Sequence, residues 1–286
     1  MTEFTDLWYH SSDGLRLYAR DYAGPGPGAP VALCMHGLTR NAADFAGLAP
    51  HLAQRYRVLV AEQRGRGRSD YDPNPANYHP GTYVQDMFTL LDGQGVQEAL
   101  LVGTSMGGLM AMLMAAMQPA RVNGIVLNDI GPEVDPAGLE RIKGYVGKTQ
   151  PAADWEQAVA QVRAINGDVF PDFTAEDWLT FTRALYREVD GQPVPAYDPA
   201  IAQPMAASDD NAVPPDLWPV FESIRELPIL VLRGIHSDIL ATSCVAEMRR
   251  RKPDLVSAEI PRRGHAPTLD EPESRRAIDS FLAALR

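Results

Sequence analysis

The sequence contains little cysteine, no long apolar run and no excess of positive charge. Its two cysteines, Cys34 and Cys244, fall in a predicted buried strand and a predicted helix, which is typical of small core residues and not of a disulfide framework. No apolar stretch is long enough to span a bilayer, and residues 1–10 carry acidic side chains without the apolar centre of a signal peptide. We therefore expect a soluble, cytoplasmic protein.

The charge balance restricts the class of partner. The formal net charge is −11 at pH 7, and no basic stripe is present, whereas nucleic acids and anionic membranes both require a positive surface. No His, Cys, Asp or Glu cluster has the spacing of a metal site, so we expect neither a metal nor an organic cofactor. The expected partner is a small-molecule substrate, and the sequence does not indicate an oligomeric state.

Short apolar runs alternate with helical stretches along the 286 residues. This alternation predicts a mostly parallel sheet with helices on both faces. Both ends of the chain contribute to the same strand series, which favours one large α/β domain with an insertion over two average domains. The predicted strands lie at 31–35, 58–61, 99–102, 125–127, 229–232 and 256–260.

A G-x-S-x-G pentapeptide, Gly103 to Gly107, stands between one of these strands and a Met-rich apolar stretch at 109–117. In such a strand-to-helix turn the central serine, Ser105, is exposed above the sheet and lies at a helix N-terminus, where backbone N–H groups favour negative charge. This context predicts that Ser105 is a nucleophile.

A nucleophilic serine needs a histidine base and a carboxylate that orients it, in the chain order serine, acid, histidine. His265 lies in a loop between a predicted strand and the predicted helix at 272–285, so it is the expected base. Asp238, beyond the strand at 229–232, is preferred as the acid. Asp129, which follows the strand at 125–127 after Asn128, is the alternative, with a helix-capping role as its other interpretation.

Acyl transfer also needs two backbone N–H donors for the oxyanion. The N–H of Met106, which follows the nucleophile, is one candidate. The N–H of Leu38, in the loop after the strand at 31–35, is the other. We interpret the nearby His36 as a structural residue of that loop, because the adjacent Gly37 suggests that the backbone itself is being positioned.

With these residues in order, the sequence resembles the α/β-hydrolase superfamily over nearly its whole length. The motifs are His36-Gly37, the run 64–70 (Arg-Gly-Arg-Gly-Arg-Ser-Asp), the serine turn, Ser237-Asp238 and Gly264-His265. One departure is Glu62, where relatives usually have Asp, and we expect it to affect loop bracing and not chemistry. The resemblance implies an eight-stranded, mostly parallel, doubly wound sheet with a helical cap.

Within this superfamily the sequence is similar to the esterase, lactonase and carbon–carbon hydrolase group, which implies a core at 1–131 plus 223–286 and a cap at 132–222, inserted after the sixth strand. The related dehalogenases and epoxide hydrolases carry an aspartate where this chain has Ser105, so both activities are disfavoured. Carbon–carbon hydrolases commonly have Asn where Thr104 stands. The expected activity is hydrolysis of an ester-like bond in a small, largely apolar substrate; carbon–carbon or lactone hydrolysis, or ligand reception on the same fold, are the alternatives.

The predicted cap contains most of the negative charge, with 16 acidic and 6 basic residues. This is either a solvated outer face or a feature that disfavours polyanionic substrates. We expect its aromatic residues to pack the cap onto the core, with one or two lining an apolar pocket above Ser105. The Pro-rich stretch 192–215 gives no basis for predicting regular structure. The aromatic residues are Trp155, Trp178, Trp218, Phe170, Phe173, Phe181 and Tyr186.

Overall fold

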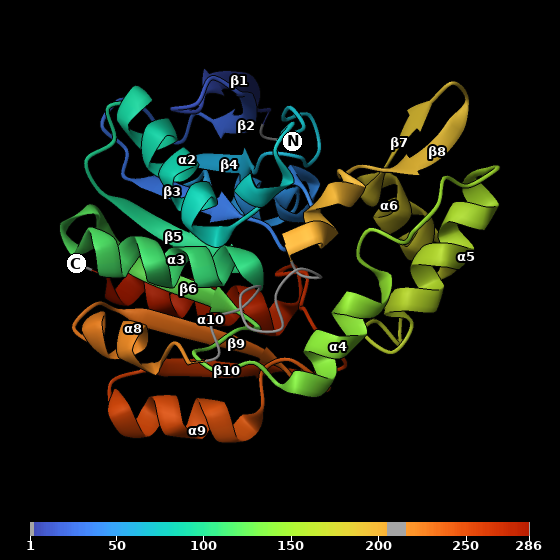
Figure 1. The fold of residues 1–286 in the computed structure, drawn as a ribbon. Helices are drawn as coiled ribbons and strands as arrows, with labels where there is room; N and C mark the ends of the chain where they lie inside the picture. Colours follow the sequence, from blue (N-terminus) through green and yellow to red (C-terminus); the bar gives the residue numbers. More distant parts are fainter. Residues whose placement is uncertain (1–2, 205–215, 286) are drawn as a thin grey trace.

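The computed structural model describes residues 3–204 and 216–285. Its centre is an eight-stranded sheet in the order β1-β2-β4-β3-β5-β6-β9-β10, in which β1, β2 and β4 pair antiparallel and all other neighbours pair parallel (Figure 1). The predicted mostly parallel sheet is therefore confirmed. The strands are β1 (Thr5–His10), β2 (Arg16–Tyr22), β3 (Val31–Met35), β4 (Arg57–Glu62), β5 (Ala99–Thr104), β6 (Val122–Asn128), β9 (Ile229–Gly234) and β10 (Val256–Ile260).

Alternation along the central strands gives the sheet two apolar faces. In β3, Leu33 and Met35 belong to one core cluster, and Ala32 and Cys34 belong to the other. Such buried strands read as continuous apolar runs because helices cover both sides. The first face packs against α2 (Pro80–Gly93), α3 (Met106–Met117), α8 (Trp218–Ser223) and α9 (Thr242–Arg251), and the second against α1 (Leu48–Leu52) and α10 (Pro272–Ala284).

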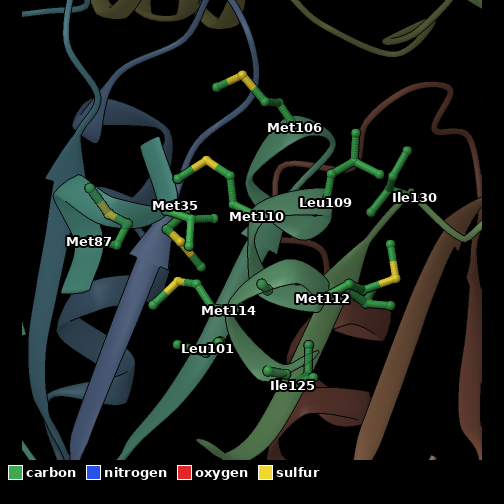
Figure 2. Packing of buried hydrophobic residues seen from close by; sticks show 14 of the residues in the cluster. Met35, Met87, Leu101, Met106, Leu109, Met110, Met112, Met114, Ile125 and Ile130 are labelled. Carbon is green, nitrogen blue, oxygen red and sulfur yellow. The ribbon is translucent and has the colours of Figure 1, made fainter. Parts of the chain in front are cut away.

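Helix α3 fixes the serine turn against the sheet. Almost all of its residues are apolar and most are buried, as expected for a helix enclosed on every side. Figure 2 shows Met110 and Met114 lying toward Met35 and Met87, while Met112 extends to the opposite side of the helix. Flexible methionine side chains fill the irregular spaces between α3 and its neighbours.

Most of the described segment between β6 and β9, apart from α8, forms a layer beside the sheet (Figure 1). It contains α4 (Pro136–Tyr145), α5 (Trp155–Asn166), α6 (Ala175–Leu185) and the 3-10 helix η4 (Pro199–Ala202). It also contains an antiparallel hairpin, β7 (Tyr186–Val189) and β8 (Gln192–Pro195), which the sequence did not predict. Asp190 and Gly191 both have positive φ in its two-residue turn, as such hairpins require. Of the stretch expected to be irregular, 205–215 lies outside the described residues.

The aromatic residues of this layer mainly pack on one another, contrary to our expectation that they join the layer to the sheet. Phe170 stacks on Phe173 with ring centroids 4.4 Å apart, and Trp178 and Phe181 meet both rings edge-on. This aromatic cluster is separate from the two clusters of the sheet. Trp218 instead packs with Phe221 of α8 against the first sheet face.

Both cysteines are free and buried, as predicted. Among residues 3–204 and 216–285, the structure has no helix that is long and apolar enough to cross a membrane.

Candidate active site

Ser105 lies in the turn between β5 and α3, in a conformation that L-residues rarely adopt. Its φ is 51° and its ψ is −116°, and its N–H donates to the carbonyl of Asn128 at 3.0 Å. The turn needs glycines on both sides, because a Cβ at Gly103 would overlap the backbone of Gly107 and a Cβ at Gly107 would overlap the carbonyl of Met35. The sharp turn therefore holds the serine side chain clear of the sheet.

The Ser105 hydroxyl lies at one end of a chain of hydrogen bonds. Its Oγ is 2.8 Å from Nε2 of His265, and Nδ1 of the same ring is 2.8 Å from Oδ2 of Asp129. Because a carboxylate only accepts, Nδ1 carries the proton and Nε2 is free to accept from the serine hydroxyl. The structure thus places Ser105 and His265 together, as the sequence predicted.

The carboxylate that contacts His265 is Asp129, the alternative candidate, and not the preferred Asp238. The Asp129 side chain is fully buried, and its Oδ1 accepts from Gly234 N–H at 2.7 Å. Its Oδ2 also accepts from the Ser237 hydroxyl at 2.5 Å. Three donors therefore fix this carboxylate at the end of β6.

Asp238 points away from the histidine and binds a helix of the inserted layer. Its carboxylate pairs with Arg141 of α4, with oxygen–nitrogen distances of 2.5 and 2.9 Å, and its side chain is 38% exposed. Burial raises the pKa of Asp238, but the hydrogen bond and charge of Arg141 more than offset this, so the pKa is lowered overall. The preference for Asp238 as the carboxylate that contacts His265 was therefore wrong. In the structure, Asp238 instead ties α4 to the sheet.

The sequence contained one signal that favoured Asp129. Asp129 follows the last residue of β6 directly, whereas Asp238 stands four residues beyond the end of β9. A side chain directly at a strand end has little freedom to turn away, while a longer loop allows Asp238 to face α4. Chain order could not separate the two, because both lie between Ser105 and His265.

The loop after β3 orients the N–H of Leu38. The Gly37 carbonyl accepts from Nδ1 of His36 at 2.7 Å and from the N–H of Arg40 at 3.2 Å. The Leu38 N–H belongs to the same planar peptide, so holding the carbonyl also sets the direction of the N–H. Within the described residues this N–H makes no hydrogen bond, which leaves it free for a ligand.

The same geometry settles the tautomer of His36. Its Nδ1 donates to Gly37, so its Nε2 accepts from the Gln63 N–H at 3.4 Å. Burial, partly offset by the hydrogen bond to Gly37, lowers the pKa of His36 to about 3. His36 is thus neutral, and its contacts agree with the structural role predicted for it.

Met106 is the first residue of α3, so its N–H has no partner within the helix. It is therefore available beside Ser105, at the positive end of the helix dipole.

Two buried side chains that the sequence did not identify as site residues brace these loops. Asn128 donates from Nδ2 to the Thr104 hydroxyl at 3.0 Å and to the Pro267 carbonyl at 2.8 Å, which joins the serine turn to the histidine loop. Glu62 accepts from the N–H groups of Ala42 and Arg68 at 3.1 and 2.6 Å, in agreement with the loop bracing expected of it. The role of Asn128 has no sequence signature, because its contacts join distant segments.

Two cavities meet at Ser105. The larger, about 640 Å³, is lined by His265, Arg40 and residues of α6, including Phe181. The smaller, about 70 Å³, is mainly apolar and is lined by Leu38, Met106 and other apolar side chains but not by His265. Of the seven aromatic residues named for the predicted cap, Phe173, Phe181 and Tyr186 line the larger cavity, which is three where one or two were expected.

Comparison with known proteins places this geometry in a family. Residues 30–233 match the family model described as alpha/beta hydrolase fold. The chain is 36% identical to 3-hydroxybutyrate-oligomer hydrolase of Cupriavidus necator, over 95% of this chain and 94% of the relative. It is also 26% identical to 2-(acetamidomethylene)succinate hydrolase of Mesorhizobium japonicum, over 89% of this chain and 88% of the relative.

A solved structure agrees along the whole chain. An alpha/beta hydrolase from Novosphingobium aromaticivorans superposes with a TM-score of 0.93 and 45% identity, covering 99% of both chains. Together with the family match and the serine turn at the end of β5, these likenesses show that the chain is an enzyme of the hydrolase type and belongs to the α/β-hydrolase family.

Proposed function

We propose that the protein is a serine esterase that works through Ser105, His265 and Asp129. The observation that carries this proposal is the continuous hydrogen-bond chain from the serine hydroxyl through the imidazole to the buried carboxylate. A serine alone is a weak nucleophile, and it gains reactivity when a histidine accepts its proton and a carboxylate stabilises the imidazolium.

The reaction runs in two halves. His265 takes the proton of Ser105, whose Oγ attacks the ester carbonyl carbon, and the N–H groups of Leu38 and Met106 stabilise the oxyanion. His265 then gives the proton to the leaving alcohol, which departs and leaves an acyl-enzyme. A water deprotonated by His265 attacks the acyl carbon, and collapse of the second oxyanion releases the acid and restores the serine.

The names of the relatives support an ester as the target. One relative is a hydrolase of 3-hydroxybutyrate oligomers, whose units are joined by ester bonds, and it matches this chain over almost its full length. The mainly apolar small cavity beside Ser105 is also suited to an acyl chain.

The test uses 4-nitrophenyl esters of increasing acyl length, with fluorophosphonate labelling of the nucleophile. We expect turnover and labelling in the wild type, and loss of both in Ser105→Ala with the fold unchanged by circular dichroism. Ser223→Ala, which removes an exposed hydroxyl on α8, is the matched control and should retain both. Undiminished turnover by Ser105→Ala would refute the proposal.

A further inference from the structure

The two cavities have different positions relative to His265. This difference indicates which cavity holds the acyl half of the ester and which holds the alcohol half. In the mechanism above, which this inference assumes, His265 must deliver its proton to the leaving oxygen. His265 lines the larger cavity and not the smaller. The leaving alcohol therefore occupies the larger cavity, and the acyl group occupies the smaller one.

The smaller cavity limits the acyl group. Its volume, about 70 Å³, is far below the 640 Å³ of the larger cavity. Its lining is mainly apolar, with Leu109, Ile130 and Ile239 beside the oxyanion amides. A short aliphatic acyl group fits this space.

In the larger cavity, which Ser105 also lines, Arg40 presents an unused pair of donors. Arg40 belongs to the same loop as Leu38, and a Cβ at Gly37 would touch both the Arg40 Cγ and the Ser105 Cβ, at 3.3 and 3.7 Å. Its Nε donates to both oxygens of Asp44, at 2.9 and 2.8 Å. Its two terminal nitrogens make no hydrogen bond to any part of the chain that the structure describes.

The Arg40 guanidinium is held in place by its other contacts. Its central carbon lies 4.4 Å from the centre of the Phe181 ring, so one face is stacked while Asp44 fixes the Nε edge. The side chain is 22% exposed, and it lines the cavity. Because one edge and one face of the guanidinium are already fixed, its two terminal nitrogens can bind an anion with little further loss of side-chain conformational freedom.

The other arginines of this cavity are committed or exposed. Arg263 donates to Glu271 and to Asp172, at 2.8 and 2.6 Å, and to the carbonyl of Arg262. Arg262 pairs with Asp172 at 3.4 Å, and its side chain is 71% exposed. Arg40 is thus the cation of this cavity best placed to bind a carboxylate, because a carboxylate matches its fork in a bidentate contact.

We propose that Arg40 binds a carboxylate on the leaving alcohol, so that the substrates are short-chain acyl esters of hydroxy acids. The carboxylate anchors the alcohol half in the larger cavity, and the acyl carbonyl then reaches Ser105 and the two amides. An uncharged alcohol would lose this anchor but would still meet the same reacting groups.

The experiment compares 3-acetoxybutanoate with 3-acetoxybutanamide, which has the same single ester bond but no charge. We expect wild-type kcat/KM to favour the carboxylate, and Arg40→Met to lower kcat/KM for the carboxylate by about 10- to 100-fold. For the amide, the change should stay within about threefold. Arg183→Met, which removes a positive charge that stacks on Trp155 outside the cavity, is the matched control. It should leave kcat/KM unchanged for both esters.

A second variant separates loss of the anchor from repulsion by Asp44, which Arg40→Met leaves unpaired. Arg40→Met/Asp44→Asn should lose the carboxylate preference to the same extent. Recovery of the preference in this double variant would overturn the proposal, and so would equal slowing of both esters by Arg40→Met, because that result indicates a structural role.

Binding by Ser105→Ala distinguishes this inference from the proposed function. Calorimetry of Ser105→Ala should show tighter binding of 3-acetoxybutanoate than of the amide, and Ser105→Ala/Arg40→Met should lose the difference. If the wild type cleaved neither ester while this difference persisted, the esterase proposal would fail and the anion site would stand. Equal binding of both esters by Ser105→Ala would overturn the anion site.

Discussion

At the residue scale, His36 shows how a buried neutral side chain can set the direction of a backbone amide. Its proton on Nδ1 holds the Gly37 carbonyl, and the peptide plane then fixes the Leu38 N–H that we assign to the oxyanion. This arrangement requires an uncharged ring, because a protonated Nε2 would face the Gln63 N–H, which is itself a donor.

The low pKa of His36 makes stability depend on pH. In the folded protein the pKa is lowered to about 3, whereas in the unfolded chain it is near 6.5. Below about pH 6.5 the unfolded chain binds a proton that the folded protein excludes, so stability falls as pH decreases, by about 1.4 kcal/mol per pH unit down to about pH 3. His36→Gln should remove this part of the acid sensitivity.

Urea unfolding at pH 7 and pH 5 provides the measurement. We expect the wild type to lose about 2 kcal/mol more than His36→Gln between these two values. His79→Gln, at an exposed helix cap, is the control and should retain the wild-type dependence. If the free energy of unfolding fell equally between pH 7 and pH 5 in the wild type and in His36→Gln, the assignment of this acid sensitivity to His36 would be contradicted.

At the scale of elements, the ends of neighbouring strands determine which carboxylate reaches His265. Strands β6 and β9 pair in parallel, so Asp129 and Asp238 leave the same edge of the sheet. The β9 end then donates Gly234 N–H and the Ser237 hydroxyl to Asp129, while Asp238 turns toward α4. One loop thus serves both the proposed active site and the attachment of the inserted layer.

This division predicts opposite results for two matched substitutions. Asp129→Asn should lower kcat for a 4-nitrophenyl ester by about 10⁴-fold, because the amide no longer stabilises the required histidine tautomer and the imidazolium. Asp238→Asn should retain kcat within about tenfold, because it weakens a part-exposed ion pair with Arg141. A large loss of kcat confined to Asp238→Asn would restore the original preference.

The sequence predicted those elements that local patterns determine. All six predicted strands occur, and α10 begins at the predicted Pro272, because apolar runs and breaker residues are local signals. The β7–β8 hairpin was missed because its strands are four residues long and β8 contains two prolines. The positions of Asn128 and Arg40 depend on contacts between distant segments, which no local pattern records. Asp129 could be named as a candidate from its place after a strand, but its contact with His265 could not be predicted.

At the scale of the whole molecule, the inserted layer has its own apolar core and a net negative charge. We propose that its α5–α6 part is a separate folding unit within the predicted cap at 132–222, which stands on a core at 1–131 plus 223–286. Its aromatic cluster supports this, since it is distinct from both clusters of the sheet.

Amide hydrogen exchange tests whether the inserted layer opens independently. Phe170 is almost fully buried and contacts Phe173, Trp178 and Phe181, so Phe170→Ala should leave a cavity and cost about 3 kcal/mol. Exchange in α5 and α6 should become roughly a hundredfold faster, while exchange in the sheet stays unchanged. Phe281→Ala on α10 is the matched control and should accelerate exchange in β9 and β10. Uniform acceleration across the chain in Phe170→Ala would mean that layer and sheet unfold as one unit, because a cooperative structure distributes the loss over all its amides.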